Sequence, residues 1–340
     1  MTKDQKPKTK NQRPKIAVFG GGSWATAIVK MLCENLDEVG WYMRSEYTLE
    51  HIKRHGHNPT YISSAKFNPK QLKLSTNINE LVDYADYLIF AIPSAFVKGE
   101  LDKVTSSFKG KVIFSAIKGI VPETGMIVGN HFVTHLNVSM DNIGVITGPC
   151  HAEEVAMERL SYLTIASLDQ EKAKIMANSL SSDFIKTKLS DDVVGTEYAA
   201  MLKNIYAIAA GIAHGLGYGD NFQAVLMSNA IREMKRFVKK EQKMKRNINN
   251  SAYLGDLLVT GYSVFSRNRM FGNMIGKGYT VKSAMMEMNM VAEGYYATKS
   301  AFKINETNNA KTPILNTVYQ ILYNNKNAKT EFNALTNLLD

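Results

Sequence analysis

The chain has very little cysteine and no long apolar run. Its 340 residues include two cysteines, Cys33 and Cys150, and no C-x-x-C pair. Two cysteines are too few for a disulfide framework and are typical of a reducing compartment, and the missing pair argues against a structural zinc site. No segment approaches the ~18–20 apolar residues of a membrane span, and the N-terminus lacks the apolar core of a secretory signal. These absences predict a cytoplasmic protein with no membrane span and no metal site.

Internal repeats are also absent, and low complexity is confined to the basic N-terminal tail, residues 1–14, which we expect to be disordered. Hydrophobic residues make up 45% of the chain and charged residues 21%, as in soluble globular proteins, and the length favours two domains. The net charge of +10 suits nucleic acid, a membrane surface or an anionic small molecule equally, so charge does not choose a partner. A second basic run, residues 235–247, predicts a solvated helix face or loop.

Apolar runs that end in Gly, Pro or Ser recur along the first half of the chain. Nearly continuous apolar strands that alternate with helices are typical of a mostly parallel sheet covered on both faces, as in a Rossmann-type α/β domain. Ligands bind at the carboxyl edge of such a sheet. The predicted strands are residues 15–20, 39–44, 86–94, 111–119, 142–149 and 161–167.

The pattern changes near residue 190. A long apolar helical run, "VVGTEYAAMLKNIYAIAAGIAHGLG", begins there, and no convincing strand pattern follows it. We therefore predict a dinucleotide-binding domain over residues 15–190 and an all-helical substrate domain over residues 191–340, with the site in the cleft between them. The glycine-rich segment 211–221 predicts a flexible loop beside that cleft.

The pattern Gly20-x-Gly22-x-x-Ala25 follows the first strand directly and opens a helix, which is the context that gives this motif meaning. Gly20 makes the turn, Gly22 lets the backbone approach a pyrophosphate, and Ala25 is small enough for helix–strand packing. The helix N-terminus adds free N–H groups for phosphate. The second strand ends in Arg44, which suits a 2′-phosphate or is a surface charge. Because Glu46 suits the ribose hydroxyls, both NAD(H) and NADP(H) stay open.

Two lysines stand among apolar neighbours. Lys118 ends the strand "VIFSAIKG", and Lys203 lies inside the helix "YAAMLKNIYAIAAG". Lost solvation lowers the pKa of a lysine and suits it to proton transfer, although a lysine in such a place can also extend its ammonium to water. Polar partners for a buried lysine are Asn204 and the pair Asp256 and Thr260, which are one helical turn apart.

Arg267 and Arg269 flank Asn268 in "FSRNRMFG", a group of donors that is either a phosphate site or an exposed basic loop. Elsewhere, His51 and His55 have the i, i+4 spacing of zinc ligands on a helix, but the glutamate of H-E-x-x-H is missing. We expect those histidines to belong to a surface segment without metal.

Taken in series, these motifs resemble the bacterial type of NAD(P)-dependent glycerol-3-phosphate dehydrogenase, from about residue 15 to residue 330 and in the family's order. The resemblance implies reversible reduction of dihydroxyacetone phosphate to sn-glycerol 3-phosphate by NAD(P)H, which supplies phospholipid synthesis. It implies no nucleic-acid partner and allows a homodimer. The stretches that carry it are "FGGGSWATA", "AIPS", "SAIKG", "ITGPCHAEE", "MLKNIYAIAAGIAHGLGYGDN", "GDLLVT", "SRNRMFG" and "VAEGYYATK".

The resemblance also implies roles for individual residues. Lys203 would exchange a proton with the carbonyl oxygen, and Lys118 would orient and polarise the substrate. The lysines would be held by Asn204, Asp256 and Thr260. The substrate would contact Lys118, Gly148, Cys150, Lys203, Asp256, Ser266, Arg267 and Asn268. The cofactor would contact Gly20, Gly22, Ser23, Trp24, Arg44, Pro93, Lys118, Ala152, Arg267, Val291 and Glu293.

The chain departs from the family pattern at several positions. Ser228-Asn229-Ala230 stands where Thr-Arg-Gly is usual, Cys150 replaces a small hydroxyl residue, and His151 replaces a residue that is commonly aromatic. With no evident base beside it, Cys150 is expected to be a packed thiol. Two other functions stay open. One is another lysine-using hydroxyacid dehydrogenase or ketoacid reductase, which would not need a phosphate site, and the other is a nucleic-acid-binding protein that uses the basic segments.

Overall fold

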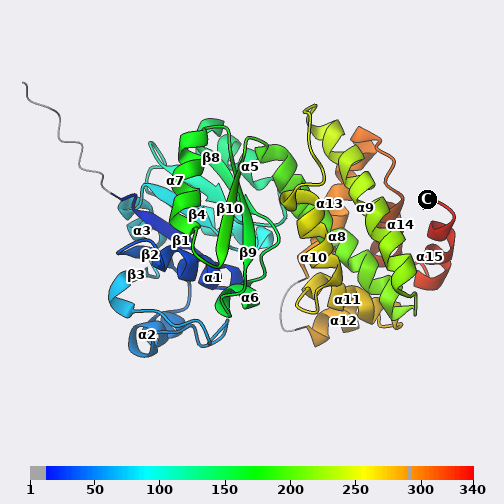
Figure 1. Ribbon diagram of the computed structural model, residues 1–340, viewed down its shortest axis with the longest axis horizontal. Helices are drawn as coiled ribbons and strands as arrows, with labels where there is room; N and C mark the ends of the chain where they lie inside the picture. Colours follow the sequence, from blue (N-terminus) through cyan, green and yellow to red (C-terminus); the bar gives the residue numbers. More distant parts are fainter. Residues whose placement is uncertain (1–12, 289–291) are drawn as a thin grey trace, which may run out of the picture.

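The computed structural model describes residues 13–288 and 292–340. Two lobes lie side by side in Figure 1, one built around a sheet and the other from helices alone. Residues 1–12 of the predicted tail lie outside the described residues. Arg13 is described, and its guanidinium donates to the carboxylate of Asp37 at 3.0 Å. None of the helices in the described ranges has the length and apolar character that a bilayer crossing requires.

The first lobe is an eight-stranded sheet with the strand order β10-β9-β8-β5-β4-β1-β2-β3. All neighbours are parallel except β8 and β9. The strands are β1 (Ile16–Phe19), β2 (Val39–Tyr42), β3 (Leu72–Ser75), β4 (Tyr87–Phe90), β5 (Val112–Ser115), β8 (Ile143–Thr147), β9 (Ser161–Ser167) and β10 (Ile185–Ser190). A separate small hairpin pairs β6 (Ile120–Val121) with β7 (Met126–Ile127).

Helices cover both faces of this sheet, and each face has its own apolar core. One face is packed by α1 (Ser23–Cys33), α6 (Ala152–Ala156) and α7 (Gln170–Leu180). The other face is packed by α3 (Ile78–Tyr84), α4 (Val97–Leu101) and α5 (Val128–Leu136). The helix α2 (Glu46–His55) begins where Ser45 accepts a hydrogen bond from the backbone of Thr48 and ends at Gly56, whose φ is positive.

The predicted mostly parallel sheet is confirmed, and each of the six predicted runs contains a strand. Strands β3 and β10 and the small hairpin were not predicted. Strands β3 and β10 lie at the two edges of the sheet and are half exposed, so their sequences "LKLS" and "IKTKLS" alternate polar with apolar residues. Continuous apolar runs are typical of strands that are buried on both faces, so edge strands with alternating residues do not show this pattern.

The second lobe is helical, as predicted, and the described residues after 190 contain no strand. Its centre is α8 (Val193–Gly215), which is buried around nearly its whole circumference, as expected of a helix that is apolar on all sides. Packed around or beside it are α9 (Asp220–Glu241), α10 (Asp256–Tyr262), α11 (Arg267–Gly276), α12 (Val281–Glu287), α13 (Glu293–Asn308), α14 (Pro313–Tyr323) and α15 (Ala328–Thr336). A single π-helical turn, Ser251–Gly255, leads into α10.

Two of the four glycines in the segment 211–221, which was predicted to form a flexible loop, are instead part of a tight helix crossing. Gly211 and Gly215 lie in α8, where each faces the backbone of α11. From the other side, Gly272 and Gly276 of α11 face the carbonyl oxygens of α8. A Cβ atom at any of the four glycines of this crossing would overlap backbone of the opposite helix. The prediction of a loop over 211–221 was therefore wrong for residues 211–215, while residues 216–219 do connect α8 to α9. Glycine here allows two helices to approach, and α11 is thereby held directly against the helix that carries Lys203.

This crossing predicts that Gly272→Ala destabilises the protein by about 1–3 kcal/mol, because the added methyl would overlap the carbonyl oxygen of Ile208 and neither backbone can yield locally. The measurement is the free energy of unfolding in urea. The control is Gly99→Ala in α4, where a Cβ meets nothing within 4 Å and the helix gains about 1 kcal/mol or less from the better helix former. Equal stability of the two variants would contradict the packing described here.

Candidate functional site

A cavity of about 830 Å³ opens along the carboxyl edge of the sheet and is closed from the other side by the helical lobe. The sheet lobe contributes Gly20, Gly21, Gly22, Ser23, Trp24, Tyr42, Met43, Arg44, Ser45, Thr48, Tyr61, Ala91, Ile92, Pro93, Phe96, Glu100, Ala116, Ile117 and Lys118. The helical lobe contributes Arg267, Phe271, Met285, Met288, Ala292, Glu293 and Tyr296. The volume and the elongated lining suit a ligand larger than a three-carbon molecule.

The glycine turn between β1 and α1 forms one wall of the cavity. Gly20 has a φ of +140°, and a Cβ there would overlap the carbonyl oxygen of Ala91, so only glycine fits. A Cβ at Gly22, in contrast, would meet no protein atom within 4 Å. Gly22 is the N-cap of α1, so the free N–H groups of that helix face the same open space. This turn therefore leaves room at the backbone for a phosphate group, as the motif predicts.

Arg44 and Glu100 form a charged pair at the end of the cavity near β2. The Arg44 guanidinium lies 5.3 Å from the ring centre of Phe96, and its Nη1 is 3.8 Å from Oε1 of Glu100. Glu100 is buried and accepts a hydrogen bond of 2.7 Å from the hydroxyl of Tyr42. Glu46 is not part of the lining and accepts a hydrogen bond from Thr76. The acidic group at this end of the cavity is thus Glu100, which sequence reasoning did not single out.

The central feature behind the cavity is a buried ion pair between Lys203 of α8 and Asp256, the first residue of α10. Both side chains are 3% exposed. The pKa of Lys203 is lowered to about 8: burial lowers it most, the carboxylate of Asp256 opposes this, and the charge of Lys118 adds to the lowering. The hydroxyl of Thr260 donates to the backbone carbonyl of Asp256 at 2.7 Å. The hydroxyl of Thr147 lies 3.5 Å from Oδ2 of the Asp256 carboxylate. The result is an ammonium that can lose its proton near neutral pH.

Lys118 lies at the cavity wall, in the loop that follows β5. Its Nζ is 4.7 Å from the ring centre of Trp24, within the range of a cation–π contact. The side-chain amide of Asn204 donates to the backbone carbonyl of Lys118 at 3.0 Å. Asn204 therefore ties this loop of the sheet lobe to α8, next to Lys203. The contact supports the prediction that Asn204 holds the lysines, although it does so through the backbone.

The segment around Arg267 lies at the start of α11. Ser266 caps this helix by accepting a hydrogen bond from the backbone N–H of Arg269 at 3.3 Å. The Oδ1 of Asn268 accepts a hydrogen bond of 2.9 Å from the backbone N–H of Gly294. This bond fixes the oxygen, and the amide nitrogen is the group of Asn268 that can donate to an anion. Arg267 and Glu293 both line the cavity. Desolvation raises the pKa of the Glu293 carboxyl group, and the positive charges of Arg267, Lys118 and Lys203 partly oppose this rise.

The structure brings most of the predicted residues together. The cavity is lined by nine of the predicted cofactor residues: Gly20, Gly22, Ser23, Trp24, Arg44, Pro93, Lys118, Arg267 and Glu293. Ala152 begins α6 and does not line it, and Val291 lies outside the described residues. The predicted substrate residues that are buried and do not line the cavity are Gly148, Cys150, Lys203, Asp256, Ser266 and Asn268. Gly148 has a φ of +123°, and a Cβ there would lie 2.7 Å from the carbonyl oxygen of Tyr162.

Two departures from the family pattern also lie here. Burial raises the pKa of the Cys150 thiol to about 12, so this side chain is a protonated thiol at neutral pH. His151 is a residue to which sequence reasoning assigned no role. Burial and the charges of Lys118 and Lys203 lower its pKa to about 4, which keeps the ring neutral. Five buried side-chain polar atoms of the described residues have no hydrogen-bond partner, and His151 Nε2 and Trp24 Nε1 are two of them. Trp24 lines the cavity, so its free indole N–H suits a site that is completed by a ligand.

His51 and His55 of α2, and His57 just after it, do not line this cavity. The Nε2 atoms of His51 and His57 are 3.5 Å apart, and the rings of His51 and His55 are tilted by 41° with their centres 4.5 Å apart. Within the two described ranges, no group of His, Cys, Asp or Glu has an arrangement that could hold a metal ion.

The family models and the relatives described here belong to one enzyme family. Two family models match the chain: NAD-dependent glycerol-3-phosphate dehydrogenase N-terminus over residues 15–173 and NAD-dependent glycerol-3-phosphate dehydrogenase C-terminus over residues 192–333. A glycerol-3-phosphate dehydrogenase [NAD(P)+] of Staphylococcus carnosus is 32% identical over 311 residues, which cover 91% of this chain and 93% of the relative. One from an Exiguobacterium species is 34% identical over 322 residues and covers 94% of each chain. The crystal structure of glycerol-3-phosphate dehydrogenase from Coxiella burnetii superimposes with a TM-score of 0.87 at 25% identity, over 95% of this chain and 99% of that chain.

The glycine turn gives a prediction that separates ligand binding from folding. Gly22→Val keeps an extended backbone that valine adopts readily and places its side chain in open space, so the variant folds but blocks the approach of a phosphate. We expect its dissociation constant for NADH and NADPH to rise by more than about tenfold, or at least ~1.4 kcal/mol. The measurement is titration calorimetry.

The matched control is Gly219→Val. Gly219 is the N-cap of α9, has nearly the same backbone angles as Gly22 and also meets nothing within 4 Å, but it does not line the cavity. This variant is expected to bind as tightly as the wild type. Unimpaired binding by Gly22→Val would exclude the turn as the phosphate site.

Proposed function

The chain belongs to the NAD-dependent glycerol-3-phosphate dehydrogenase family, and from that membership we propose that it catalyses the reversible reduction of dihydroxyacetone phosphate to sn-glycerol 3-phosphate with NAD(P)H. The observation that carries the proposal is the buried pair of Lys203 and Asp256 beside a cavity with a glycine phosphate turn. This arrangement joins a proton donor of suitable pKa to a dinucleotide site.

The residues of this chain account for the proton and for the orientation of the substrate. When bound, the dinucleotide supplies a hydride from C4 of its nicotinamide ring. In our proposal, Lys203 donates the proton from Nζ to the carbonyl oxygen during reduction and takes it back during oxidation. Asp256 keeps Lys203 protonated at neutral pH despite its burial. Lys118 polarises the same carbonyl from the opposite lobe, where its charge also favours the developing alkoxide.

The phosphate of the substrate is assigned to the start of α11. The charge of Arg267, the amide nitrogen of Asn268 and the positive end of the helix all favour an anion there. Because α11 is packed against α8 through glycines, this phosphate site is fixed relative to Lys203. A rigid distance between the phosphate anchor and the proton donor would place the central carbon of a three-carbon substrate at the donor.

We further propose that residues 15–190 form the cofactor domain and residues 191–340 the substrate domain, that the enzyme works in the cytoplasm, and that its product supplies phospholipid synthesis. The scarcity of cysteine and the family membership support the last two. Binding of either NADH or NADPH is supported by the geometry near β2, where Arg44 attracts a 2′-phosphate and Glu100 disfavours one.

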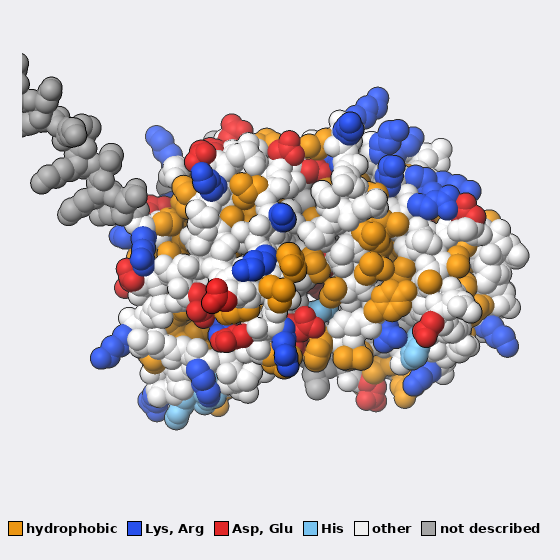
Figure 2. All heavy atoms as spheres, in the orientation of Figure 1, with side chains coloured by type: hydrophobic (Ala, Val, Ile, Leu, Met, Phe, Trp, Pro, Cys, Tyr) orange, Lys and Arg blue, Asp and Glu red, His pale blue; other side chains and the backbone are white. Residues whose placement is uncertain are grey.

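A homodimer is also proposed. Exposed apolar side chains gather near the junction of the two lobes (Figure 2). Separately, Leu160, Tyr162 and Leu189, which lie on or next to β9 and the edge strand β10, are exposed. Apolar groups that gather on a surface favour association. Sedimentation equilibrium measures the mass in solution, and a value equal to that of one chain would exclude this part of the proposal.

The test of the proposed function is oxidation of NADH and of NADPH by the purified protein with dihydroxyacetone phosphate. Three-carbon keto acids such as pyruvate serve as the comparison, because a hydroxyacid dehydrogenase would accept the carboxylate and have no use for the phosphate. We expect turnover with the phosphorylated ketone alone. Turnover with the keto acid, or with neither compound, would refute the proposal.

The ion pair makes a prediction for pH and mutation. Because Lys203 has a pKa of about 8 and must be protonated for reduction, the rate of reduction falls as pH rises through about 8, and the rate of oxidation rises over the same range. Lys203→Met is expected to lower kcat for reduction by roughly 10²–10⁴-fold, the contribution typical of a positioned acid, while NADH still binds. The measurements are pH–rate profiles of kcat and a cofactor titration.

The comparison variant is Arg267→Ala, which removes a charge from the phosphate site and leaves the proton donor in place. It is expected to raise KM for dihydroxyacetone phosphate and to keep the loss of activity near pH 8. If Lys203→Met retains the kcat and the pH profile of the wild type, another group is the acid.

A further inference from the structure

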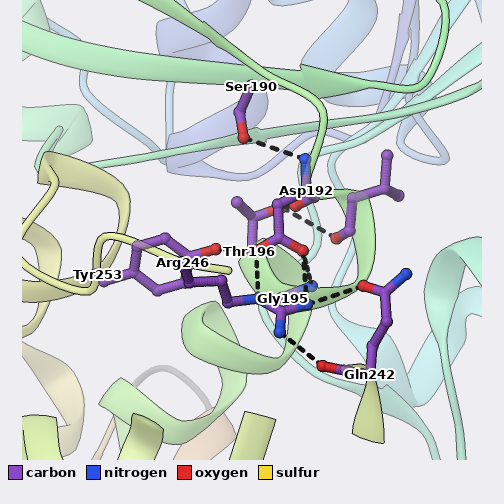
Figure 3. A network of polar contacts seen from close by, with 8 residues as sticks. Ser190, Asp192, Gly195, Thr196, Gln242, Arg246 and Tyr253 are labelled. Atoms are coloured by element: carbon purple, nitrogen blue, oxygen red, sulfur yellow. Dashed lines mark hydrogen bonds and ion pairs between the residues drawn. The ribbon is translucent and has the colours of Figure 1, made fainter. Parts of the chain in front are cut away.

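A polar network around Asp192 joins the two chain segments that carry Lys203 and Asp256 (Figure 3). Asp192 directly precedes α8, and its carboxylate binds the guanidinium of Arg246 at two points, with Nε 2.5 Å from Oδ2 and Nη2 2.9 Å from Oδ1. The hydroxyl of Tyr253 donates to the same carboxylate. The side chains of Arg246 and Asp192 are only 7% and 6% exposed, so solvent does not compete for these bonds.

Asp192 also caps the N-terminus of α8. Its carboxylate accepts the backbone N–H of Gly195 at 2.9 Å, and its backbone carbonyl accepts the hydroxyl of Thr196 at 2.8 Å. A Cβ at Gly195 would overlap the carboxylate and would lie 2.5 Å from Nε of Arg246. The N-terminus of α8 and the guanidinium are therefore packed around one carboxylate with no spare space. Lys203 lies on the same continuous helix.

Tyr253 connects this network to Asp256. Tyr253 belongs to the π-helical turn Ser251–Gly255, and Asp256 is the residue that follows this turn. Single π-turns are rare and are frequent at functional sites, since they change the direction of the side chains that follow. Here the hydroxyl of Tyr253 holds the turn to the carboxylate of Asp192, which also caps α8. The contact between α8 and the turn therefore lies three residues before Asp256, the partner of Lys203.

Arg246 comes from the basic run that was expected to be a solvated face. The expectation fails at this residue, although the nearby Lys243 and Lys245 are exposed. Besides Asp192, its guanidinium donates to the backbone carbonyl of Gln242 at 2.7 Å and to the side-chain oxygen of Gln242 at 2.8 Å. The guanidinium thus donates hydrogen bonds from Nε and from both terminal nitrogens. These bonds fix its position and connect the end of α9 to the N-terminus of α8.

We propose that Asp192, Arg246 and Tyr253 are positioning residues that hold Asp256 against Lys203. The inference rests on the proposed function, because it assigns the network a consequence for the proton donor. If the network loosens, the π-turn and Asp256 move away from α8. Lys203 then loses the carboxylate that keeps its ammonium charged and gives up its proton at a lower pH.

The sign of this effect follows from the charged groups around Lys203. Asp256 comes from α10, Lys118 from the loop after β5, Glu293 from the start of α13, and His151 from the residue before α6. Of these, only Asp256 follows the π-turn directly. Loosening the network therefore removes a negative neighbour and leaves the positive charge of Lys118 in place.

The experiment uses Tyr253→Phe, which removes one hydroxyl and keeps the ring, the ion pair and the helix cap. We expect the fall in the rate of reduction with rising pH to move to lower pH, so that kcat above neutral pH drops several-fold. KM for NADH, and kcat on the acidic side of the profile, should stay near the wild-type values. The protonation midpoint of Lys203, followed by NMR of lysine side chains labelled at Cε, should shift in the same direction.

The matched control is Tyr198→Phe. Tyr198 lies in the same core and its hydroxyl bonds Glu241, so this variant also deletes one tyrosine hydroxyl but does not touch Asp192. A second pair separates charge from geometry: Arg246→Lys keeps the charge and should retain more of the wild-type pH profile than Arg246→Met. Unfolding in urea reports the loss of stability for every variant, and a purely structural role predicts lower stability with an unshifted profile.

The outcomes are distinct. A shift for Tyr253→Phe and for Arg246→Met, with no shift for Tyr198→Phe, supports the proposal. Equal pH profiles and equal Lys203 midpoints in all variants would overturn it, as would a shift of the same size in the Tyr198→Phe control. Turnover by the wild type tests the proposed function separately, and the NMR midpoint decides the positioning role even if the wild type proves inactive on dihydroxyacetone phosphate.

Discussion

The ion pair between Lys203 and Asp256 is the interaction on which the rest of the site depends. An ammonium that is only 3% exposed costs free energy unless a charge faces it, and Asp256 is equally buried. Burial without Asp256 would leave Lys203 a neutral amine at physiological pH. Asp256 without burial would leave Lys203 with the high pKa of an ordinary lysine. The two together set the pKa of Lys203 to about 8, where a proton can move in either direction. Helix packing, the polar network and the lobe junction all serve to keep this pair in place.

The helical lobe fixes the pair through two different kinds of contact. Gly211 and Gly215 of α8 and Gly272 and Gly276 of α11 let the two backbones touch, which sets the phosphate segment against the lysine helix. On another side of α8, the carboxylate of Asp192 sets the distance to the π-turn and hence to Asp256. The sheet lobe supplies the cavity and Lys118, and the bond from Asn204 to the backbone of Lys118 connects the two lobes beside the reacting groups.

Sequence patterns predicted the sheet, the helical second half and the glycine turn, because each depends on local periodicity and on a short motif in a definite context. They missed β3 and β10, whose polar edges hide the strand signal, and they misassigned Gly211 and Gly215 to a loop. Glycine marks both a flexible loop and a close helix crossing, and the sequence does not distinguish them. Arg246 was missed for a related reason: within a basic run, an arginine whose side chain is 7% exposed has the same sequence pattern as the exposed lysines beside it.

The sequence by itself therefore determined the fold class, the place of the dinucleotide turn and the family, since these follow from the order of apolar segments and from motifs that local backbone geometry requires. Only the tertiary structure decided which groups face one another. Lys203 and Asp256 are 53 residues apart in the sequence, and their contact requires α8, the π-turn and α10 to pack in one arrangement. Glu100, His151 and the Asp192 network became visible in the same way. Burial and charge proximity depend on distances in space, and distances between remote segments are set by packing.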